Sequence, residues 1–254
     1  MYKLIKPFGY HIEANSIGEA WLDIVDAIIS NGDKTFDEGR ERLCLQNVRI
    51  HIDSPQLPDK LLGKYANKKN IDDIVYLTFK GEKMYDFDVK PSFSPGAKSY
   101  YARLKEGQMV EFVVERLAKI PESKKAVISF IHWNDYKSVL ANPYDDYLPC
   151  IVSIQFRLIP MNGGYQMTVV FNSRSIDAYQ KSNGNMTAIV MLANDICTKL
   201  TKRLGKEVTL KTVDGLITDA HIYIECYEDA QNLVTSFQKG ETFEKESGLS
   251  NAVI

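Results

Sequence analysis

The sequence between residues 148 and 185 contains the side chains whose types and spacing could do covalent chemistry. Cys150 follows a proline, Gln155 lies five residues further on, and Arg174 lies on the next predicted strand. A cysteine attacks as its thiolate, which is scarce at neutral pH unless a nearby cation favours it. Arg174 could supply that cation. The pattern therefore predicts nucleophilic catalysis by Cys150, and the alternative is an inert, buried thiol.

Further polar residues follow this pair at defined spacings. Arg174 is followed by Ser175 and Asp177, and Asn185 lies eleven residues after the arginine. The amide of Asn185 can accept a hydrogen bond from uracil N3–H and donate one to O4, which favours uracil over cytosine. The alternatives are local ones, because Asn185 could cap the helix that follows and Asp177 could close a turn.

A separate predicted strand carries Asp219, His221 and Tyr223. Alternate side chains of a strand point to the same face, so His221 and Tyr223 should lie side by side. Such a pair is more often simple sheet packing than a binding site. The preceding Asp219 and the wider pattern favour a binding role here.

These segments, taken in order, resemble the thymidylate synthase superfamily, whose members attach a folate-borne one-carbon unit to C5 of a pyrimidine nucleotide. The resemblance rests on a Pro-Cys nucleophile followed by Gln-Phe, an Arg-Ser-x-Asp run, an Asn at the matching distance, an Asp-x-His-x-Tyr strand, and the segment Pro121-Glu122-Ser123-Lys124-Lys125 ahead of an apolar strand. It covers most of the chain. It implies a single α+β domain over residues 1–254 with a three-layer fold, in which a large mixed sheet is flanked by helices and one sheet face forms a homodimer interface.

The resemblance also implies roles for individual residues. The thiolate of Cys150 would add to C6 of the base, Arg174 would favour the thiolate and contact the nucleotide phosphate, and 5,10-methylenetetrahydrofolate would be the co-substrate. Asp177 would orient the base or the folate ring. Tyr100 or Tyr101 would help to remove the C5 proton, and His221 and Tyr223 would contact the sugar hydroxyl. Gln155, Ser175 and Asn185 would contact the substrate. Arg40 or Arg42 would bind the phosphate, and Lys124 and Lys125 would bind the phosphate in the site of a partner subunit.

Three departures from the family pattern leave the product open. Ile151 replaces the usual histidine after the nucleophile, residues 180–184 replace a Leu-Gly-x-Pro-Phe stretch, and two lysines replace two arginines. A methylase would make thymidylate from dUMP, whereas a hydroxymethylase would act on dUMP, CMP or dCMP. A third hypothesis, from another class, is a nucleotide- or RNA-binding descendant without turnover, which would not need Cys150. The fourth is an unrelated α+β domain that matches by chance.

The bulk composition is that of an ordinary globular protein. The chain has 254 residues, of which 44% are hydrophobic and 25% are charged, and its net charge of −2 gives no electrostatic footprint for nucleic acid or an anionic membrane. We expect neither a signal peptide nor a membrane span. The four cysteines are far apart in the sequence, so we expect free thiols, no metal site and a cytoplasmic location.

Hydrophobic periodicity predicts the elements that must position these residues. We expect helices over 20–29 (capped by Ser16), 106–119, 186–204 and 229–238, strands over 43–52, 126–133, 151–159, 165–171, 208–213 and 217–225, and loops over 54–70 and 90–99. Most of the strands are predicted to join one mixed sheet.

Overall fold

The computed structural model describes residues 2–5, 9–37, 39–85, 97–141 and 148–243. These residues form one nine-stranded sheet in the order β1-β2-β4-β9-β7-β6-β5, with β3 also paired to β4 and β8 to β9. Strand β9 is parallel to β7 and antiparallel to β4, so the sheet is mixed. The strands are β1 (Tyr2–Ile5), β2 (Gly9–Ala14), β3 (Asp33–Asp37), β4 (Arg40–Asp53), β5 (Val127–Ser129), β6 (Ile151–Met161), β7 (Gly164–Ser173), β8 (Ile176–Asp177) and β9 (Glu207–Tyr223).

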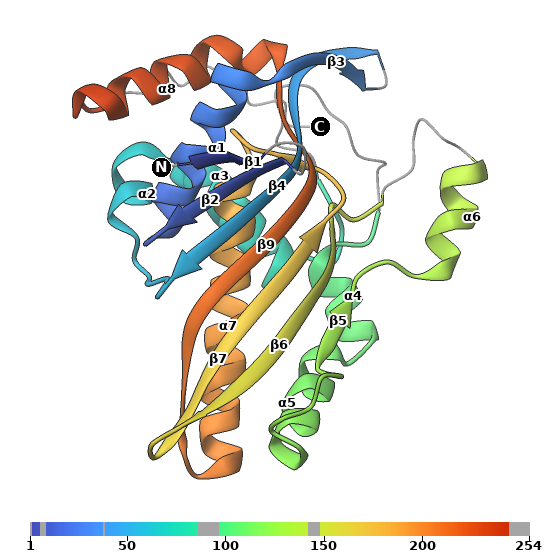
Figure 1. The fold of residues 1–254 in the computed structure, drawn as a ribbon. Helices are drawn as coiled ribbons and strands as arrows, with labels where there is room; N and C mark the ends of the chain where they lie inside the picture. The colour runs from blue at the N-terminus through green and yellow to red at the C-terminus, as the bar shows by residue number, and fades with distance from the viewer. Residues whose placement is uncertain (1, 6–8, 38, 86–96, 142–147, 244–254) are drawn as a thin grey trace.

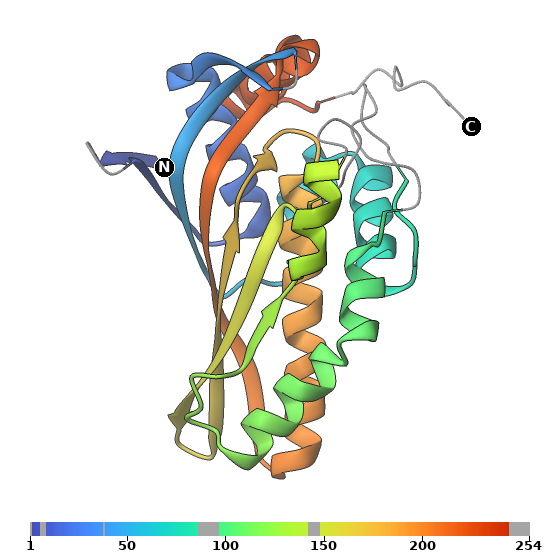
Figure 2. The same cartoon turned by 90° about the vertical axis from the view of Figure 1, so that its right-hand side faces the viewer.

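Helices cover one face of this sheet. Figure 2 shows α4, α5 and α7 together on one side of the strands, and Figure 1 looks onto the other side. The helices are α1 (Ile17–Asn31), α2 (Lys60–Tyr65), α3 (Lys68–Phe79), α4 (Tyr100–Glu106), α5 (Met109–Lys119), α6 (Trp133–Ala141), α7 (Ser182–Leu204) and α8 (Tyr227–Lys239), with a 3-10 turn at Ile224–Cys226. The predicted α+β class and the large mixed sheet flanked by helices are confirmed. The three-layer arrangement of the family and the homodimer interface stay predictions.

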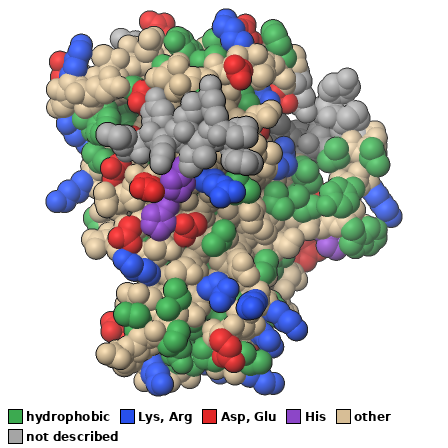
Figure 3. Space-filling view, in the orientation of Figure 1, with side chains coloured by type: hydrophobic (Ala, Val, Ile, Leu, Met, Phe, Trp, Pro, Cys, Tyr) green, Lys and Arg blue, Asp and Glu red, His purple; other side chains and the backbone are tan. Residues whose placement is uncertain are grey.

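The face of the sheet turned toward the viewer in Figure 3 is polar. Histidine, acidic and basic side chains gather on it between smaller apolar ones. His51 on β4 and Asp214 on β9 lie opposite each other and are joined by a 2.7 Å hydrogen bond between Nδ1 and Oδ1. A second subunit seated on this face would therefore have to match charged groups as well as apolar ones.

The elements with strong local signals form where the sequence predicts them. Ser16 caps α1 by accepting from the amide of Glu19, and the indole of Trp21 on that helix donates to the carbonyl oxygen of Ala178 at 3.1 Å. The hairpin between β6 and β7 turns at Gly163, whose φ is +89°. Helix α7 ends at Gly205, whose φ is +63°. These features confirm the predictions of the first helix, the hairpin and the end of the long helix.

The predicted loop over 54–70 is wrong, because it contains α2 and the start of α3. Asp59 caps α2 by accepting from the amides of Leu61 and Leu62, and it also accepts from the amide of Gly18 on α1 at 2.9 Å. Asn67 caps α3 in the same way. The polar residues that suggest a loop are thus the helix caps themselves. The second predicted loop, over 90–99, lies mostly outside the described residues, and its last residue, Ser99, caps α4.

Other predicted boundaries also differ from the structure. The helix expected over 106–119 is interrupted at Gly107 and Gln108, and Gln108 has a φ of +47°, so that α4 ends before α5 begins. The strand expected over 126–133 is limited to β5, since Trp133 already starts α6. Helix α7 begins at Ser182, four residues earlier than expected. The two strands expected over 208–213 and 217–225 are one continuous strand, β9.

Gly215 allows β9 to continue past the ring of Phe171 on β7. The two residues are register partners, and a Cβ atom at Gly215 would lie 2.2 Å from the ring of the fully buried Phe171. We expect Gly215→Ala to lower the free energy of unfolding by about 1–3 kcal/mol through overpacking. Urea unfolding measures the change. Gly63→Ala is the control, because its Cβ would meet no atom within 4 Å and alanine suits a helix better than glycine. Equal stabilities of the Gly215→Ala variant and the unchanged protein would contradict this prediction.

No helix within the described residues has both the length and the apolar content that a bilayer span requires.

Candidate functional site

Cys150 lies directly before β6 and is half-buried. Its carbonyl oxygen accepts two hydrogen bonds from the end of β7, one from the amide of Arg174 at 2.9 Å and one from the hydroxyl of Ser173 at 2.8 Å. These bonds fix the backbone that carries the thiol. The other three cysteines are buried, on β4, on α7 and in the 3-10 turn.

The guanidinium of Arg174 binds the backbone of the two residues that precede Cys150. Its Nε donates to the carbonyl oxygen of Pro149 at 3.2 Å, and its Nη2 donates to that of Leu148 at 2.7 Å. The structure therefore brings Arg174 beside the segment that ends in Cys150. The side chain is exposed, so its charge can also meet a ligand that approaches from solvent. A direct contact between the guanidinium and the sulfur stays a prediction.

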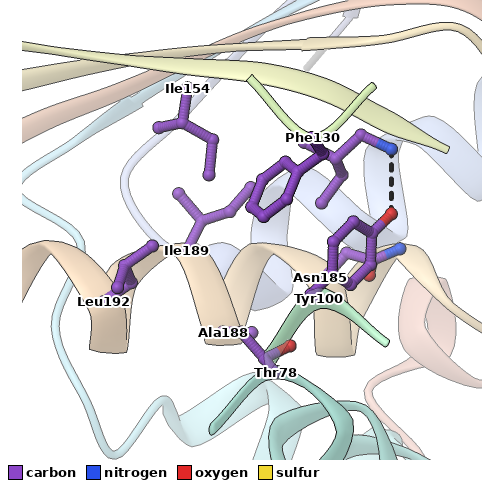
Figure 4. Close-up of a pocket in the computed structure, with 9 residues that line it drawn as sticks. Thr78, Tyr100, Phe130, Ile154, Asn185, Ala188, Ile189 and Leu192 are labelled. Carbon is purple, nitrogen blue, oxygen red and sulfur yellow. Dashed lines mark hydrogen bonds between the residues drawn. The ribbon is translucent and has the colours of Figure 1, made fainter. Parts of the chain in front are cut away.

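Tyr100, the first residue of α4, reaches the chain on the other side of the cysteine. Its hydroxyl accepts a hydrogen bond from the amide of Ile151 at 2.9 Å, drawn as the dashed line in Figure 4. Its ring packs edge to face against Phe130, with the ring centroids 4.8 Å apart. The sequence alone does not distinguish between Tyr100 and Tyr101 as the residue that helps to remove the C5 proton. Tyr100 is the one that lies next to the residue following Cys150.

Asn185 projects from the first turns of α7 into the same region. Lys181 is the N-cap of that helix, so the alternative role of Asn185 as the cap is wrong. Its side chain is only 7% exposed, and within the described residues its amide has no hydrogen-bond partner. Figure 4 shows it at the end of a small apolar pocket, which is lined by Thr78, Tyr100, Phe130, Ile151, Ile154, Asn185, Ala188, Ile189 and Leu192. Within the described residues, no other group competes with a ligand for this amide.

The carboxylate of Asp177 accepts three local hydrogen bonds. Its Oδ1 accepts from the amides of Tyr179 and Gln180, and its Oδ2 accepts from the side-chain amide of Gln180 at 2.7 Å. The carboxylate thus closes the turn that leads into α7, which is the local alternative that the sequence leaves open. A contact with a base or a folate ring would have to use the remaining lone pair and stays a prediction.

His221 lies in a buried network of polar side chains on β4 and β9. Arg42 holds Asp219 with both ends of its guanidinium, at 2.6 Å and 3.0 Å, and its Nη1 also lies 3.0 Å from Nδ1 of His221. The same Nδ1 is 2.9 Å from Oδ1 of Asp219 and 3.4 Å from the hydroxyl of Ser175. Cys44 donates to the second oxygen of Asp219 at 3.2 Å. The sequence alone identifies Asp219 and His221 but gives no sign of their bonds to Arg42 and Cys44.

Tyr223 links this network to Arg40. The rings of His221 and Tyr223 pack edge to face with centroids 4.9 Å apart, so the predicted neighbours on β9 do lie together. The guanidinium of Arg40 stacks over the Tyr223 ring at 3.5 Å from its centroid, and its Nε lies 3.4 Å from a carboxylate oxygen of Glu225. Arg40 is only 7% exposed. The predicted contact between Arg40 and a phosphate stays untested.

Gln155, Lys124 and Lys125 lie apart from these groups. Gln155 is five residues beyond Cys150 along β6, a separation of roughly 15 Å in a strand, and its side-chain amide donates to the carbonyl oxygen of Lys124 at 2.9 Å. Both lysine side chains are exposed. They are not brought to the Cys150 of their own chain, so the role implied for them at a partner's phosphate would require a second subunit.

The Asp219 carboxylate should make stability depend on acid pH. Burial raises its pKa, but hydrogen bonds from His221 and Cys44 and the charges of His221 and Arg42 outweigh burial and lower the pKa from 3.8 to about 2. A lowered pKa stabilises the folded state above the unfolded value, and this contribution is lost as the pH falls from about 4 to about 2. Over this pH range, we expect the free energy of unfolding of Asp219→Asn to fall by about 2 kcal/mol less than that of the unchanged protein. Urea unfolding across this pH range measures it. Parallel pH dependences in the variant and the unchanged protein would refute the prediction.

Comparison with known proteins gives a similarity that covers most of the chain. No family model matches the chain. A protein of Methanothermobacter marburgensis described as "Putative thymidylate synthase" is 23% identical over 237 residues, which cover 89% of this chain and 98% of that protein. The similarity suggests a thymidylate synthase-like family and does not specify the reaction.

Proposed function

We propose that this protein transfers a one-carbon unit from 5,10-methylenetetrahydrofolate to C5 of a pyrimidine nucleoside monophosphate, and that its reaction is the methylation of dUMP. The observation that carries the proposal is the side-chain amide of Asn185, which has no hydrogen-bond partner among the described residues and lines a small pocket shared with Tyr100 and Ile151. Ile151 directly follows Cys150, so the proposed nucleophile lies next in the chain to a residue of this pocket. The full-length similarity to the archaeal protein supports the same reading.

The proposed reaction starts with the Cys150 thiolate. It adds to C6 of the uracil ring, and the electron pair of the C5–C6 bond moves toward O4 to give an enolate. C5 then attacks the methylene carbon of the folate. Tyr100 assists removal of the C5 proton, the folate nitrogen leaves, and an exocyclic methylene remains on C5. Hydride from tetrahydrofolate converts it to a methyl group, and expulsion of the thiolate releases thymidylate and dihydrofolate.

Asn185 reads the base in this proposal. Uracil presents an N–H at N3 and an acceptor at O4, so one amide can form hydrogen bonds with both groups at once. Cytosine presents the opposite pattern, which the amide matches only if its oxygen and nitrogen exchange places. In this proposal the amide keeps the orientation that suits uracil, so that cytosine leaves polar groups unpaired.

The nucleotide phosphate is bound by cations from two subunits in this proposal. Arg174 presents an exposed guanidinium next to the nucleophile, and a guanidinium fork suits a phosphate. Lys124 and Lys125 are exposed and distant from the Cys150 of their own chain, which supports their use by a partner. The proposed protein is therefore a homodimer with nucleotide and folate as substrates.

A hydroxymethylase is the second candidate. The segment that replaces the family's apolar stretch before Asn185 is polar and buried, with Gln180, Ser182 and Asn183 each at most 2% exposed. In this candidate, water attacks the exocyclic methylene to give a hydroxymethyl group and tetrahydrofolate. Substrates would then be dUMP, CMP or dCMP.

Tritium release distinguishes these candidates. The protein is incubated with methylenetetrahydrofolate and C5-tritiated dUMP, CMP or dCMP, and the product is identified by mass. Release with a methylated base supports the proposal, and release with a hydroxymethylated base supports the second candidate. Nucleotide binding without release from any of the three would overturn both and would favour a nucleotide- or RNA-binding protein without turnover.

A further inference from the structure

Three polar groups surround one ring nitrogen of His221. Nδ1 is surrounded by Arg42 at 3.0 Å, Asp219 at 2.9 Å and Ser175 at 3.4 Å. The side chain is only 5% exposed. Within the described residues no hydrogen bond engages Nε2. The described residues therefore surround one ring nitrogen from several sides and form no hydrogen bond with the other.

Arg42 is the residue that makes this arrangement rigid. Its guanidinium is always charged and can only donate, and its two terminal nitrogens bind the two oxygens of Asp219 in a fork. The same Nη1 lies 3.0 Å from Nδ1 of His221. Its side chain is only 11% exposed, and that of Asp219 is 20% exposed, so water competes weakly for these bonds.

The Nδ1 contact holds the ring in either of its neutral forms. If Nδ1 has a lone pair, it accepts from Arg42, and if it carries the proton, it donates to Asp219. In each form one of these two groups holds the ring, and the two groups are themselves bound to each other. Loss of Arg42 would free Asp219 from its fork, and it would remove the bond to Nδ1 in the form that has the lone pair there.

We propose that Arg42 is a positioning residue that acts through Asp219 and His221, so that Nε2 of His221 is presented to the sugar hydroxyl of the nucleotide. The ligand contact rests on the proposed function, whereas the orientation of His221 does not. Arg42 thereby affects binding of nucleotides that carry this hydroxyl without touching the reacting atoms.

The first experiment tests the orientation in the protein without ligand. Ring-nitrogen NMR signals of His221 are assigned by their absence in His221→Gln and are then compared between the unchanged protein and Arg42→Gln. We expect them to move, while the signals of His132, which lies near α6, stay in place. Unmoved His221 signals would overturn the proposal, whatever the protein's activity.

The second experiment tests the ligand contact by removing the hydroxyl from the ligand. We expect Arg42→Gln to weaken binding of dUMP by about tenfold, as for one lost hydrogen bond, and to change binding of 2′,3′-dideoxyuridine monophosphate by less than about twofold. Arg42→Lys should behave like Arg42→Gln, since an ammonium keeps the charge but cannot form the fork. Arg203→Gln, at the far end of α7, is the control that should bind both nucleotides normally.

The outcomes separate this inference from the proposed function. Equal losses for the two nucleotides would show a general structural effect and would overturn the role of Arg42, as would normal dUMP binding by Arg42→Lys. Absence of dUMP binding by the unchanged protein would refute the proposed function instead. In that case the NMR comparison still decides whether Arg42 positions His221. Circular dichroism and the melting temperature show whether each variant is folded.

Discussion

Replacement of Cys150 by alanine should abolish tritium release from C5-labelled dUMP, with a loss of at least about 10³-fold, while dUMP still binds within about threefold of its normal affinity. The loss is large because the thiolate forms the covalent bond that turns C5 into a nucleophile, and no neighbouring group can replace it. Binding survives because Asn185 and Arg174 do not depend on the sulfur. Release is measured in the supernatant after charcoal treatment, and binding is measured by equilibrium dialysis.

The matched control removes a different thiol. Cys197 is buried on α7, and burial raises the pKa of its thiol to about 12, so it cannot act as a thiolate near neutral pH. Cys197→Ala should therefore keep its tritium release and lose only some stability. Appreciable turnover by Cys150→Ala, or an equal loss in Cys197→Ala, would show that Cys150 is not the nucleophile.

Replacement of Asn185 by aspartate should reverse the preference for the base. A carboxylate only accepts hydrogen bonds, so it can bind the 4-amino group of cytosine but has no hydrogen to donate to O4 of uracil. We expect kcat/KM for dUMP to fall by about 10²-fold and turnover of dCMP to rise by at least about tenfold. Competition between the two labelled nucleotides in one reaction measures the ratio directly.

Asn183→Asp provides the same amide-to-carboxyl change two residues away. Asn183 is also buried, but its side-chain oxygen accepts from the backbone amide of Gly184, and it does not line the pocket. This variant should change the rates with both nucleotides alike. If Asn185→Asp also lowers both rates without altering their ratio, Asn185 supports the helix and does not read the base.

Local signals explain which parts of the fold could be predicted from the sequence. Helix α1 has a capping pattern and a continuous apolar face, and α7 ends at a glycine with positive φ, so both were predictable. Helix α6 buries none of its residues, and hence its sequence lacks the apolar periodicity on which helix prediction depends.

Tertiary contacts explain the errors. Asp214 and Gly215 together are typical of a turn, yet β9 runs through them because Gly215 makes room for the ring of Phe171 on β7. Asp59 looks like a loop residue in the sequence, but it joins α2 to α1 through the amide of Gly18. Such contacts involve residues far apart in the chain, and spacing alone does not reveal them.

The candidate site was predictable in its residue types but not in its partners. The sequence indicates Cys150, Asn185 and His221, and it leaves the choice between Arg40 and Arg42 open. The register of β4 against β9 separates the two arginines, since it sets Arg42 in the fork on Asp219, whereas Arg40 stacks on Tyr223. Register depends on strand pairing across almost 180 residues of chain, which one sequence does not determine.

The most direct measurement of the central claim is the mass of the protein after incubation with 5-fluoro-dUMP and methylenetetrahydrofolate. Fluorine at C5 cannot leave as a proton does, so the ring should stay bonded both to the attacking sulfur and to the folate carbon. We predict one nucleotide and one folate unit per chain, mapped by proteolysis to the peptide that contains Cys150. Bound nucleotide without a covalent adduct, or an adduct on Cys44, Cys197 or Cys226, would contradict the account.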